Sequence, residues 1–323
     1  MNAIAAIAIG RNEGARLIAC LKSLKTQPQL SCIVYVDSGS TDESVAAARD
    51  LGAEVVLLDT ARPFTAARAR NAGLAALAQD PPDLVQFVDG DCILDPGWIG
   101  AATDFLADHP GVAVVCGRRR EMHPEASVYN RMCDAEWNTP VGETHACGGD
   151  ALIRWSALEA VGGYDPALIA GEEPEMCLRM RRAGWRIWRL DAEMTLHDAA
   201  MTRLNQFWQR MRRGGFAAAE GAAMYGRGAE RHGVAAVRRA VLWGLALPVA
   251  ILLAALFWGP LVLLALLVYP AQILRLALRD GGGRLAWERA LFLTLGKFAE
   301  AQGVMEYHWR QMRGGAVRLI EYK

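Results

Sequence analysis

Several features are scarce or missing in this 323-residue sequence. Its 35 basic and 35 acidic residues leave no net charge. The seven cysteines show no CxxC spacing and sit mostly in apolar stretches, so the pattern indicates neither a zinc site nor a disulfide framework. There is no internal repeat and no low-complexity tract. No basic and then apolar leader precedes the first apolar stretch at 3–9, so we expect no signal peptide and a catalytic part that stays in the cytosol.

The balanced charge hides an asymmetry between the two parts of the chain. Residues 1–200 carry 18 Lys and Arg against 28 Asp and Glu, whereas residues 201–323 carry 17 against 7. An acidic front part suits metal binding. The basic back part has arginines that flank apolar runs, which favours an anionic membrane surface and argues against nucleic acid as a partner.

The first hundred residues alternate between two hydrophobic patterns. Apolar runs typical of strands alternate with runs of helical periodicity, which is the pattern of βαβ units in a doubly wound, mostly parallel sheet. The expected strands are Ala3–Ile9, Cys32–Val36, Glu54–Leu58 and Leu84–Val88, and the expected helices are Glu13–Lys25, Asp42–Leu51 and Ala66–Leu77. Ligands of such sheets bind beyond the carboxyl ends of the strands, where polar clusters stand in this sequence.

Residues 112–197 are less regular and are expected to complete the site. We predict a strand at Val112–Cys116, a glycine turn at Gly148-Gly149, a helix near 173–183 and a strand near 187–190.

A long apolar run extends from Val241 to Leu278, with arginines at both ends and a break at 258–260. The run is longer than one membrane span requires. Divided at the break, it gives two spans that are each slightly short. Basic residues at both ends favour a hairpin whose ends both stay on the cytoplasmic side. The alternative is a buried helical hairpin of a soluble protein. Residues 285–312 have the spacing of an interfacial amphipathic helix, and a third span is left open.

These patterns predict four segments. They are an α/β domain at 1–215, an interfacial connector at 216–239, a transmembrane hairpin at 240–279 and an amphipathic or cytoplasmic segment at 280–323.

Acidic residues form two motifs that could carry chemistry. Asp89-Gly90-Asp91 follows a strand and offers oxygen ligands for a hard divalent cation, although Asp-Gly is also ordinary turn chemistry. Glu172-Glu173 precedes Pro174, which is placed to start a helix, and acidic residues there commonly act as helix caps. His197 is a metal ligand or a polar loop residue.

The order of these motifs resembles that of the family 2 glycosyltransferases of the GT-A fold, over residues 1 to about 215. The resemblance is carried by Asp37-Ser-Gly-Ser-Thr-Asp42, Ala69-Arg-Asn-Ala-Gly73, Asp89-Gly-Asp91, Gly148-Gly149, Gly171-Glu-Glu-Pro-Glu-Met-Cys-Leu-Arg179 and His197.

The resemblance implies a role for each matching residue. Nucleotide and donor contacts would come from Arg11, Asn12, Glu13, Asp37, Arg70, Asn71, Asp89, Gly148 and Gly149. The metal, Mg²⁺ or Mn²⁺, would be held by Asp89, Asp91 and His197. The general base matches Glu173, where the family more usually has aspartate, and Glu172 remains an alternative.

The implied reaction is a single displacement with inversion, in which a sugar passes from a nucleotide-diphosphate donor to an acceptor hydroxyl. Residues 209–213 lie where processive members carry Gln-x-x-Arg-Trp, but Arg213 replaces the tryptophan, which argues against polymerisation. Arg210, Arg212 and Arg213 are candidates for binding acceptor or donor phosphates, or for facing anionic lipid.

Three alternatives stay open. A polyprenyl-phosphate glycosyltransferase would need little help from a base, a nucleotidyltransferase would release pyrophosphate, and a membrane scaffold would keep the fold without catalysis. The expected setting is the cytoplasmic face of a bacterial inner membrane, with a lipid-linked or saccharide acceptor used in envelope or exopolysaccharide synthesis.

Overall fold

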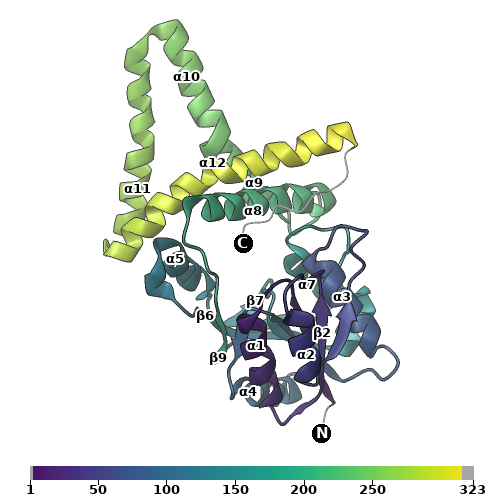
Figure 1. The fold of residues 1–323 in the computed structure, drawn as a ribbon. Coiled ribbons are helices and arrows are strands. Elements are labelled where there is room, and N and C mark those ends of the chain that lie inside the picture. The colour runs from purple at the N-terminus through teal and green to yellow at the C-terminus, as the bar shows by residue number, and fades with distance from the viewer. Residues whose placement is uncertain (1–2, 315–323) are drawn as a thin grey trace. The chain divides into compact units, whose positions relative to one another are not determined.

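The computed structural model describes residues 3–314, which divide into two units (Figure 1). The sheet unit consists of residues 3–124 and Cys133–Ala200, and the helical unit consists of Glu125–Met132 and 201–314. We predicted an α/β domain that extends to residue 215. The sheet unit instead ends at Ala200, because the helix that follows packs within the helical unit.

The sheet unit contains one mixed sheet with the strand order β3-β2-β1-β4-β8-β6-β9-β5, and β7 pairs with β9. The first four strands of this order are parallel, which confirms the predicted βαβ arrangement. Strands β8, β5 and β7 run antiparallel to their neighbours, and β6 is parallel to β9. The strands are β1 (Ile4–Gly10), β2 (Leu30–Asp37), β3 (Glu54–Leu57), β4 (Leu84–Asp89), β5 (Cys92–Leu94), β6 (Val112–Glu121), β7 (Gly142–Thr144), β8 (Ala151–Arg154) and β9 (Arg186–His197).

Helices connect these strands and position their carboxyl ends. They are α1 (Ala15–Lys25), α2 (Ser44–Asp50), α3 (Ala66–Leu77), α4 (Trp98–Asp108), α6 (Trp155–Val161) and α7 (Glu172–Arg182), while η1 (Pro124–Ala126) and α5 (Val128–Trp137) lead from one unit to the other. The inner strand β1 is buried along almost its whole length, as expected for a strand covered on both faces. A Cβ at Gly73 would lie 2.5 Å from Cγ2 of Ile7, so glycine lets α3 approach β1 closely.

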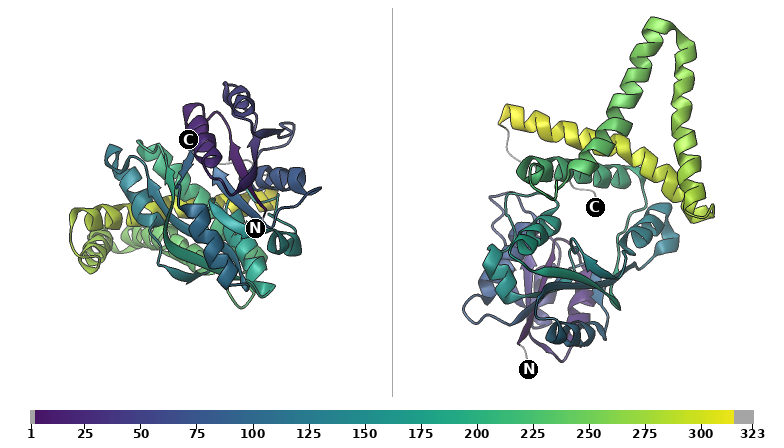
Figure 2. Two further views of the ribbon diagram at one scale, coloured as in Figure 1. Left: turned by 90° about the horizontal axis from the view of Figure 1, so that it is seen from below. Right: turned by 180° about the vertical axis from the view of Figure 1, so that it is seen from behind.

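The helical unit is built on a close pair of long helices, α8 (Leu204–Tyr225) and α12 (Arg284–Arg313), which lie along each other (Figures 1 and 2). A Cβ at Gly215 would lie 2.0 Å from the carbonyl oxygen of Glu300, and one at Gly303 would lie 2.0 Å from that of Arg212. The two backbones therefore touch at glycines. Within the predicted amphipathic segment at 280–323, α12 is one 30-residue helix, and residues 315–323 lie outside the described part of the chain.

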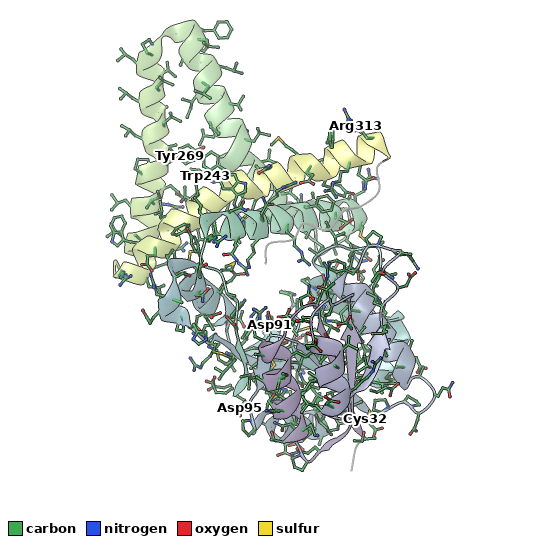
Figure 3. The ribbon with its side chains drawn as sticks, viewed as in Figure 1. Cys32, Asp91, Asp95, Trp243, Tyr269 and Arg313 are labelled. Carbon is green, nitrogen blue, oxygen red and sulfur yellow. The ribbon has the colours of Figure 1, made fainter. Side chains whose placement is uncertain are left out.

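The predicted hairpin is formed by two apolar arms. The first runs through α9 (Val234–Val241), a π-helical stretch η2 (Leu242–Ala246) and α10 (Leu247–Trp258), and the second through a 3₁₀ stretch η3 (Pro260–Leu267) and α11 (Val268–Arg279). By length and composition, Val234–Trp258 and Pro260–Arg279 could each cross a membrane, and both are largely exposed. Near their base, Tyr269 donates a hydrogen bond from its hydroxyl to the carbonyl oxygen of Trp243 at 2.6 Å (Figure 3).

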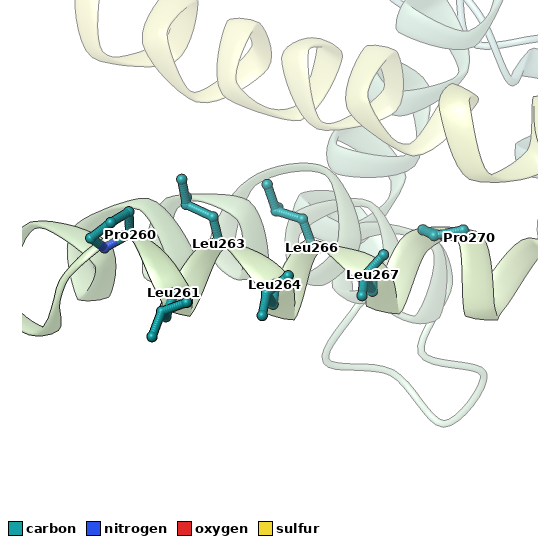
Figure 4. A pocket seen from close by; sticks show the side chains of 7 residues that line it. All are labelled: Pro260, Leu261, Leu263, Leu264, Leu266, Leu267 and Pro270. Atoms are coloured by element: carbon teal, nitrogen blue, oxygen red, sulfur yellow. The ribbon is translucent and has the colours of Figure 1, made fainter.

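The second arm presents an apolar surface along its 3₁₀ stretch. Leu261, Leu264 and Leu267 form one row at a spacing of three residues, while Leu263 and Leu266 point to the opposite side (Figure 4). The row is 61–79% exposed, and the segment borders a shallow apolar hollow of about 440 Å³. A surface of this kind is unusual in contact with water.

Candidate active site

The loops after β1 and β2 bind each other through short polar side chains. Asn12 has a φ of 56°, and its side-chain oxygen accepts a hydrogen bond from the backbone N–H of Thr41 at 2.7 Å. Asp37 is buried and accepts bonds from the backbone N–H groups of Gly39 and Ser40 at 2.9 and 2.8 Å. Both residues therefore shape the loops predicted to meet the nucleotide.

The other two predicted residues of this edge also have local partners. The guanidinium of Arg11 lies 4.4 Å from the ring centre of Phe64, and Glu13 forms an ion pair with Arg16 at 2.7 Å. Arg11, Asn12, Glu13 and Asp37 thus come together at the carboxyl ends of β1 and β2, as the strand pattern predicts.

Arg70 connects Asp89 to the acidic pair. From α3, its guanidinium contacts Asp89 at 2.9 Å, Glu173 at 2.8 Å and Glu172 at 3.1 Å. Burial opposes its charge, but the carboxylates of Glu173 and Asp89 more than offset this and raise the pKa of Arg70. Arg70 thus keeps its charge and joins Asp89 at the end of β4 to the start of α7.

The acidic pair stands at the first turn of α7, which begins after Gly171 at a φ of 78°. Glu172 is buried, whereas the side chain of Glu173 is 15% exposed. Burial, reinforced by the charge of Glu172, raises the pKa of Glu173 to about 7. A carboxylate with this pKa can take up a proton near neutral pH, which is the property required of a general base.

Asp89 lies between two arginines and close to a glycine. One carboxylate oxygen contacts Arg70, and the other lies 3.4 Å from Arg119. A Cβ at Gly149 would lie 2.6 Å from Oδ2 of Asp89 and 2.7 Å from Nη2 of Arg70, so no larger residue fits there without a shift. The neighbouring Gly148 faces open space.

Asp91 and His197 form a second group. The Nε2 atom of His197 lies 3.1 Å from Oδ2 of Asp91, and both side chains are buried (Figure 3 marks Asp91). Strand β9 brings His197 opposite Cys92 of β5, directly after Asp91. Burial and the charge of Arg119 lower the pKa of His197 to about 4, so the imidazole is neutral at pH 7.

This second group has the donor atoms of a metal site. Ligand atoms of Asp91, Cys92 and His197 all lie within 4.8 Å of one another, while Asp89 groups with Cys92 and Asp150 instead. The Nδ1 atom of His197 is buried without a hydrogen-bond partner among residues 3–314. A neutral imidazole with a carboxylate can bind Mn²⁺ or Mg²⁺.

Two important residues of the site were not singled out from the sequence. Asp150 is buried and accepts hydrogen bonds from the backbone N–H of Asp89 at 3.0 Å, from Thr195 at 2.8 Å and from Nε of Arg119 at 3.0 Å. Carboxylates raise the pKa of Arg119 although its burial works in the opposite direction. Two features of the sequence could have indicated these residues. Asp150 directly follows Gly148-Gly149, and Arg119 lies in a run of three arginines within strand β6.

Other predicted residues lie in different settings. The side chain of Asn71 donates to the carbonyl oxygen of Tyr164 at 2.7 Å and accepts from its N–H at 2.9 Å, so it orders the loop before α7. Arg210, Arg212 and Arg213 lie on α8 in the helical unit. Nε of Arg212 donates to Glu306 of α12 at 2.6 Å, which gives this arginine a packing role.

Several known proteins have a similar sequence or a similar fold. The succinoglycan biosynthesis protein ExoA of Rhizobium meliloti is 26% identical over 211 residues, which cover 61% of this chain and 64% of ExoA. The pre-mycofactocin glycosyltransferase of Mycobacterium tuberculosis is 26% identical over 201 residues, or 57% of this chain and 39% of that protein. The matches thus span less than two thirds of these relatives.

The fold is similar to that of a solved enzyme along nearly the whole chain. The mannosyltransferase PcManGT from Pyrobaculum calidifontis, solved with GDP-Man and Mn²⁺, has a TM-score of 0.66 and 20% identity, covering 96% of this chain and 88% of that one. Residues 7–159 match the model of the family described as glycosyl transferase family 2. Residues 7–159 therefore match a family 2 glycosyltransferase domain, and the fold is of the GT-A type.

Proposed function

We propose that the protein transfers a sugar from a nucleotide-diphosphate sugar to an acceptor hydroxyl with inversion at the anomeric carbon. The observation that carries this proposal is the link made by Arg70. It holds Asp89, on the proposed donor side, and Glu173, whose pKa is raised to about 7, in one partly buried cluster. A donor bound at Asp89 and an acceptor hydroxyl at Glu173 would then meet between them.

In the proposed reaction, the acceptor oxygen forms a bond to the anomeric carbon while the bond from that carbon to the diphosphate breaks. Glu173 takes the proton of the acceptor hydroxyl, and Glu172 is the alternative base. Arg70 and Arg119 supply fixed positive charge beside Asp89, in a site partly shielded from water, where such charge stabilises a leaving diphosphate more strongly than in bulk water.

We propose that Asp91 and His197 hold a divalent cation, Mn²⁺ or Mg²⁺, with Asp89 on the side of the donor diphosphate. A bound cation would neutralise part of the charge that the diphosphate gains. The unpartnered Nδ1 of His197, its neutral imidazole and its position beside Asp91 fit such a ligand. The Mn²⁺ in the PcManGT structure supports the same assignment.

We further propose that Val234–Trp258 and Pro260–Arg279 anchor the protein in a bacterial inner membrane, with the sheet unit on the cytoplasmic side. The exposed leucines of η3 and the length of both arms support this setting. An acceptor in or on the same membrane, such as a lipid-linked intermediate of polysaccharide synthesis, would suit it. The similarity to a succinoglycan biosynthesis protein points the same way.

Donor hydrolysis tests this proposal without a known acceptor. The full chain in detergent is offered UDP-, GDP- and TDP-sugars with Mn²⁺, Mg²⁺ or a chelator, and release of the nucleoside diphosphate is measured against an Asp91→Asn control. Metal-dependent hydrolysis of one donor, lost in the variant, supports the proposal. Release of pyrophosphate would indicate nucleotidyl transfer, and absence of any metal-dependent donor binding would leave the scaffold alternative.

A separate test addresses the membrane. The full chain is mixed with vesicles of phosphatidylglycerol and phosphatidylethanolamine during detergent removal, and flotation is followed with and without 1 M salt, which screens surface charge. An inserted hairpin stays with the vesicles in salt. Release by salt would indicate attachment through surface charge instead.

A further inference from the structure

Trp137 lies beside the proposed metal site and has no part in the reaction as described so far. It is the last residue of α5 and is half-buried. Its ring centre is 4.6 Å from that of His197, at an angle of 34° between the ring planes, and the guanidinium of Arg119 lies 5.4 Å from the indole centre. The indole therefore covers two charged or metal-binding groups of the site.

The side chains of Arg119 and His197 both come from strands of the sheet. Arg119 of β6 pairs with Thr195 of β9, two residues before His197, and side chains two residues apart point from the same face of a strand. The hydrogen bonds agree with this arrangement, because Thr195 and Arg119 both donate to the carboxylate of Asp150. The indole thus lies against two side chains from one face of the sheet, and part of its surface stays exposed.

The polar edge of the indole is also available. Within residues 3–314, no acceptor takes a hydrogen bond from the indole N–H of Trp137. A tryptophan that serves only packing usually gives this N–H a partner when it is buried. A partly exposed ring with an unused donor, held in place by two groups of the site, is suited to contact a ligand.

We propose that Trp137 is a stacking platform for a sugar ring of the substrate, an inference that rests on the proposed function. A pyranose has an apolar face of C–H groups bordered by hydroxyls. The indole offers it a flat apolar surface, whose electron-rich face attracts polarised C–H groups, and a donor at the edge for a hydroxyl. The ring is that of the donor sugar or of a saccharide acceptor. An acceptor that consists only of a lipid phosphate would make no use of the platform.

The experiment compares the full chain in detergent with Trp137→Leu, Trp137→Met and Trp137→Phe. Leu and Met keep apolar cover over His197 but lose the flat face, and Phe keeps a smaller flat face. Trp188→Leu is the matched control and should leave substrate binding unchanged. Trp188 is also half-buried, its ring centre lies 5.4 Å from that of Phe105, and the guanidinium of Arg186 lies 5.1 Å from its ring centre.

Two measurements separate the two sources of the ring. Calorimetry gives the affinity for the nucleotide sugar identified in the donor screen and for its free nucleoside diphosphate, and initial rates give KM for a panel of methyl hexosides as acceptors. A loss of about tenfold in affinity for the nucleotide sugar alone would assign the platform to the donor. A rise of about tenfold in acceptor KM alone would assign it to the acceptor. Phe should recover most of either loss.

The outcomes that overturn the inference are distinct from those that overturn the proposed function. If folded Leu and Met variants bind the nucleotide sugar and use the hexosides like the unmodified protein, Trp137 is not a platform, although the glycosyltransferase proposal stands. If the loss is equal for the nucleoside diphosphate and the nucleotide sugar, Trp137 only supports the site. If the unmodified protein binds neither compound, both proposals fail.

Discussion

Replacement of Glu173 by glutamine tests the proposed base most directly. Burial and the neighbouring Glu172 raise the pKa of Glu173 to about 7, so its carboxyl is protonated and inactive as a base at lower pH. The ionised fraction is then about one tenth at pH 6 and about nine tenths at pH 8. We therefore expect kcat to rise roughly tenfold between these pH values. Glu173→Gln keeps the size of the side chain and should lower kcat by about 10²- to 10⁴-fold.

The assay follows release of the nucleoside diphosphate at saturating donor and acceptor between pH 5.5 and 8.5. The rising limb near pH 7 should vanish in Glu173→Gln. Glu172→Gln should keep the limb but move it to lower pH, because the charge of Glu172 helps to raise the pKa of Glu173. Transfer at the original rate by Glu173→Gln, with the limb unchanged, would refute the assignment. If the acceptor used were a polyprenyl phosphate, that result would support the alternative in which a phosphate attacks without a base.

Three further predictions concern packing at and away from the site. Gly149→Ala should weaken donor binding at least about tenfold with a small change in Tm, because the added Cβ would lie 2.6 Å from Oδ2 of Asp89. Gly148→Ala is the control, because Gly148 faces open space. Equal donor affinity of the two variants would contradict this prediction. Asp150→Ala should destabilise the protein by about 3–5 kcal/mol in urea unfolding, because it leaves Arg119 without its main buried partner; a loss below about 1 kcal/mol would show that Asp89 suffices. Gly303→Ala should lower the Tm measured in detergent by several degrees, because its Cβ would lie 2.0 Å from the backbone of α8, and an unchanged Tm would mean that the two helices separate freely.

The part of the fold that was predictable from the sequence is the part made by consecutive elements. The four parallel strands and the helices between them follow from apolar runs of alternating period, and their polar ends converge because parallel strands end at one edge. The two apolar arms were predictable for the same reason, since their pattern is local.

What the sequence did not reveal depends on pairing between distant segments. Arg119 and Asp150 meet because β6 and β8 pair, and neither strand's pattern indicates that partner. The helix α8 continues across the predicted boundary at 215, because glycines allow it to pack on α12, about 85 residues further along the chain. The reciprocal bonds of Asn71 to Tyr164 likewise join residues that only the fold brings together.

The 3₁₀ stretch η3 changes how far the second arm of the hairpin reaches. A 3₁₀ helix rises about 2.0 Å per residue and an α-helix about 1.5 Å, so the 20 residues of Pro260–Arg279 extend roughly 34 Å instead of roughly 30 Å. The second arm has five residues fewer than the first, and the 3₁₀ winding of eight residues makes up part of this difference in length. If the arm crosses a bilayer as proposed, with a hydrocarbon layer about 30 Å thick, the added length would let it tilt without drawing its terminal arginine into the lipid.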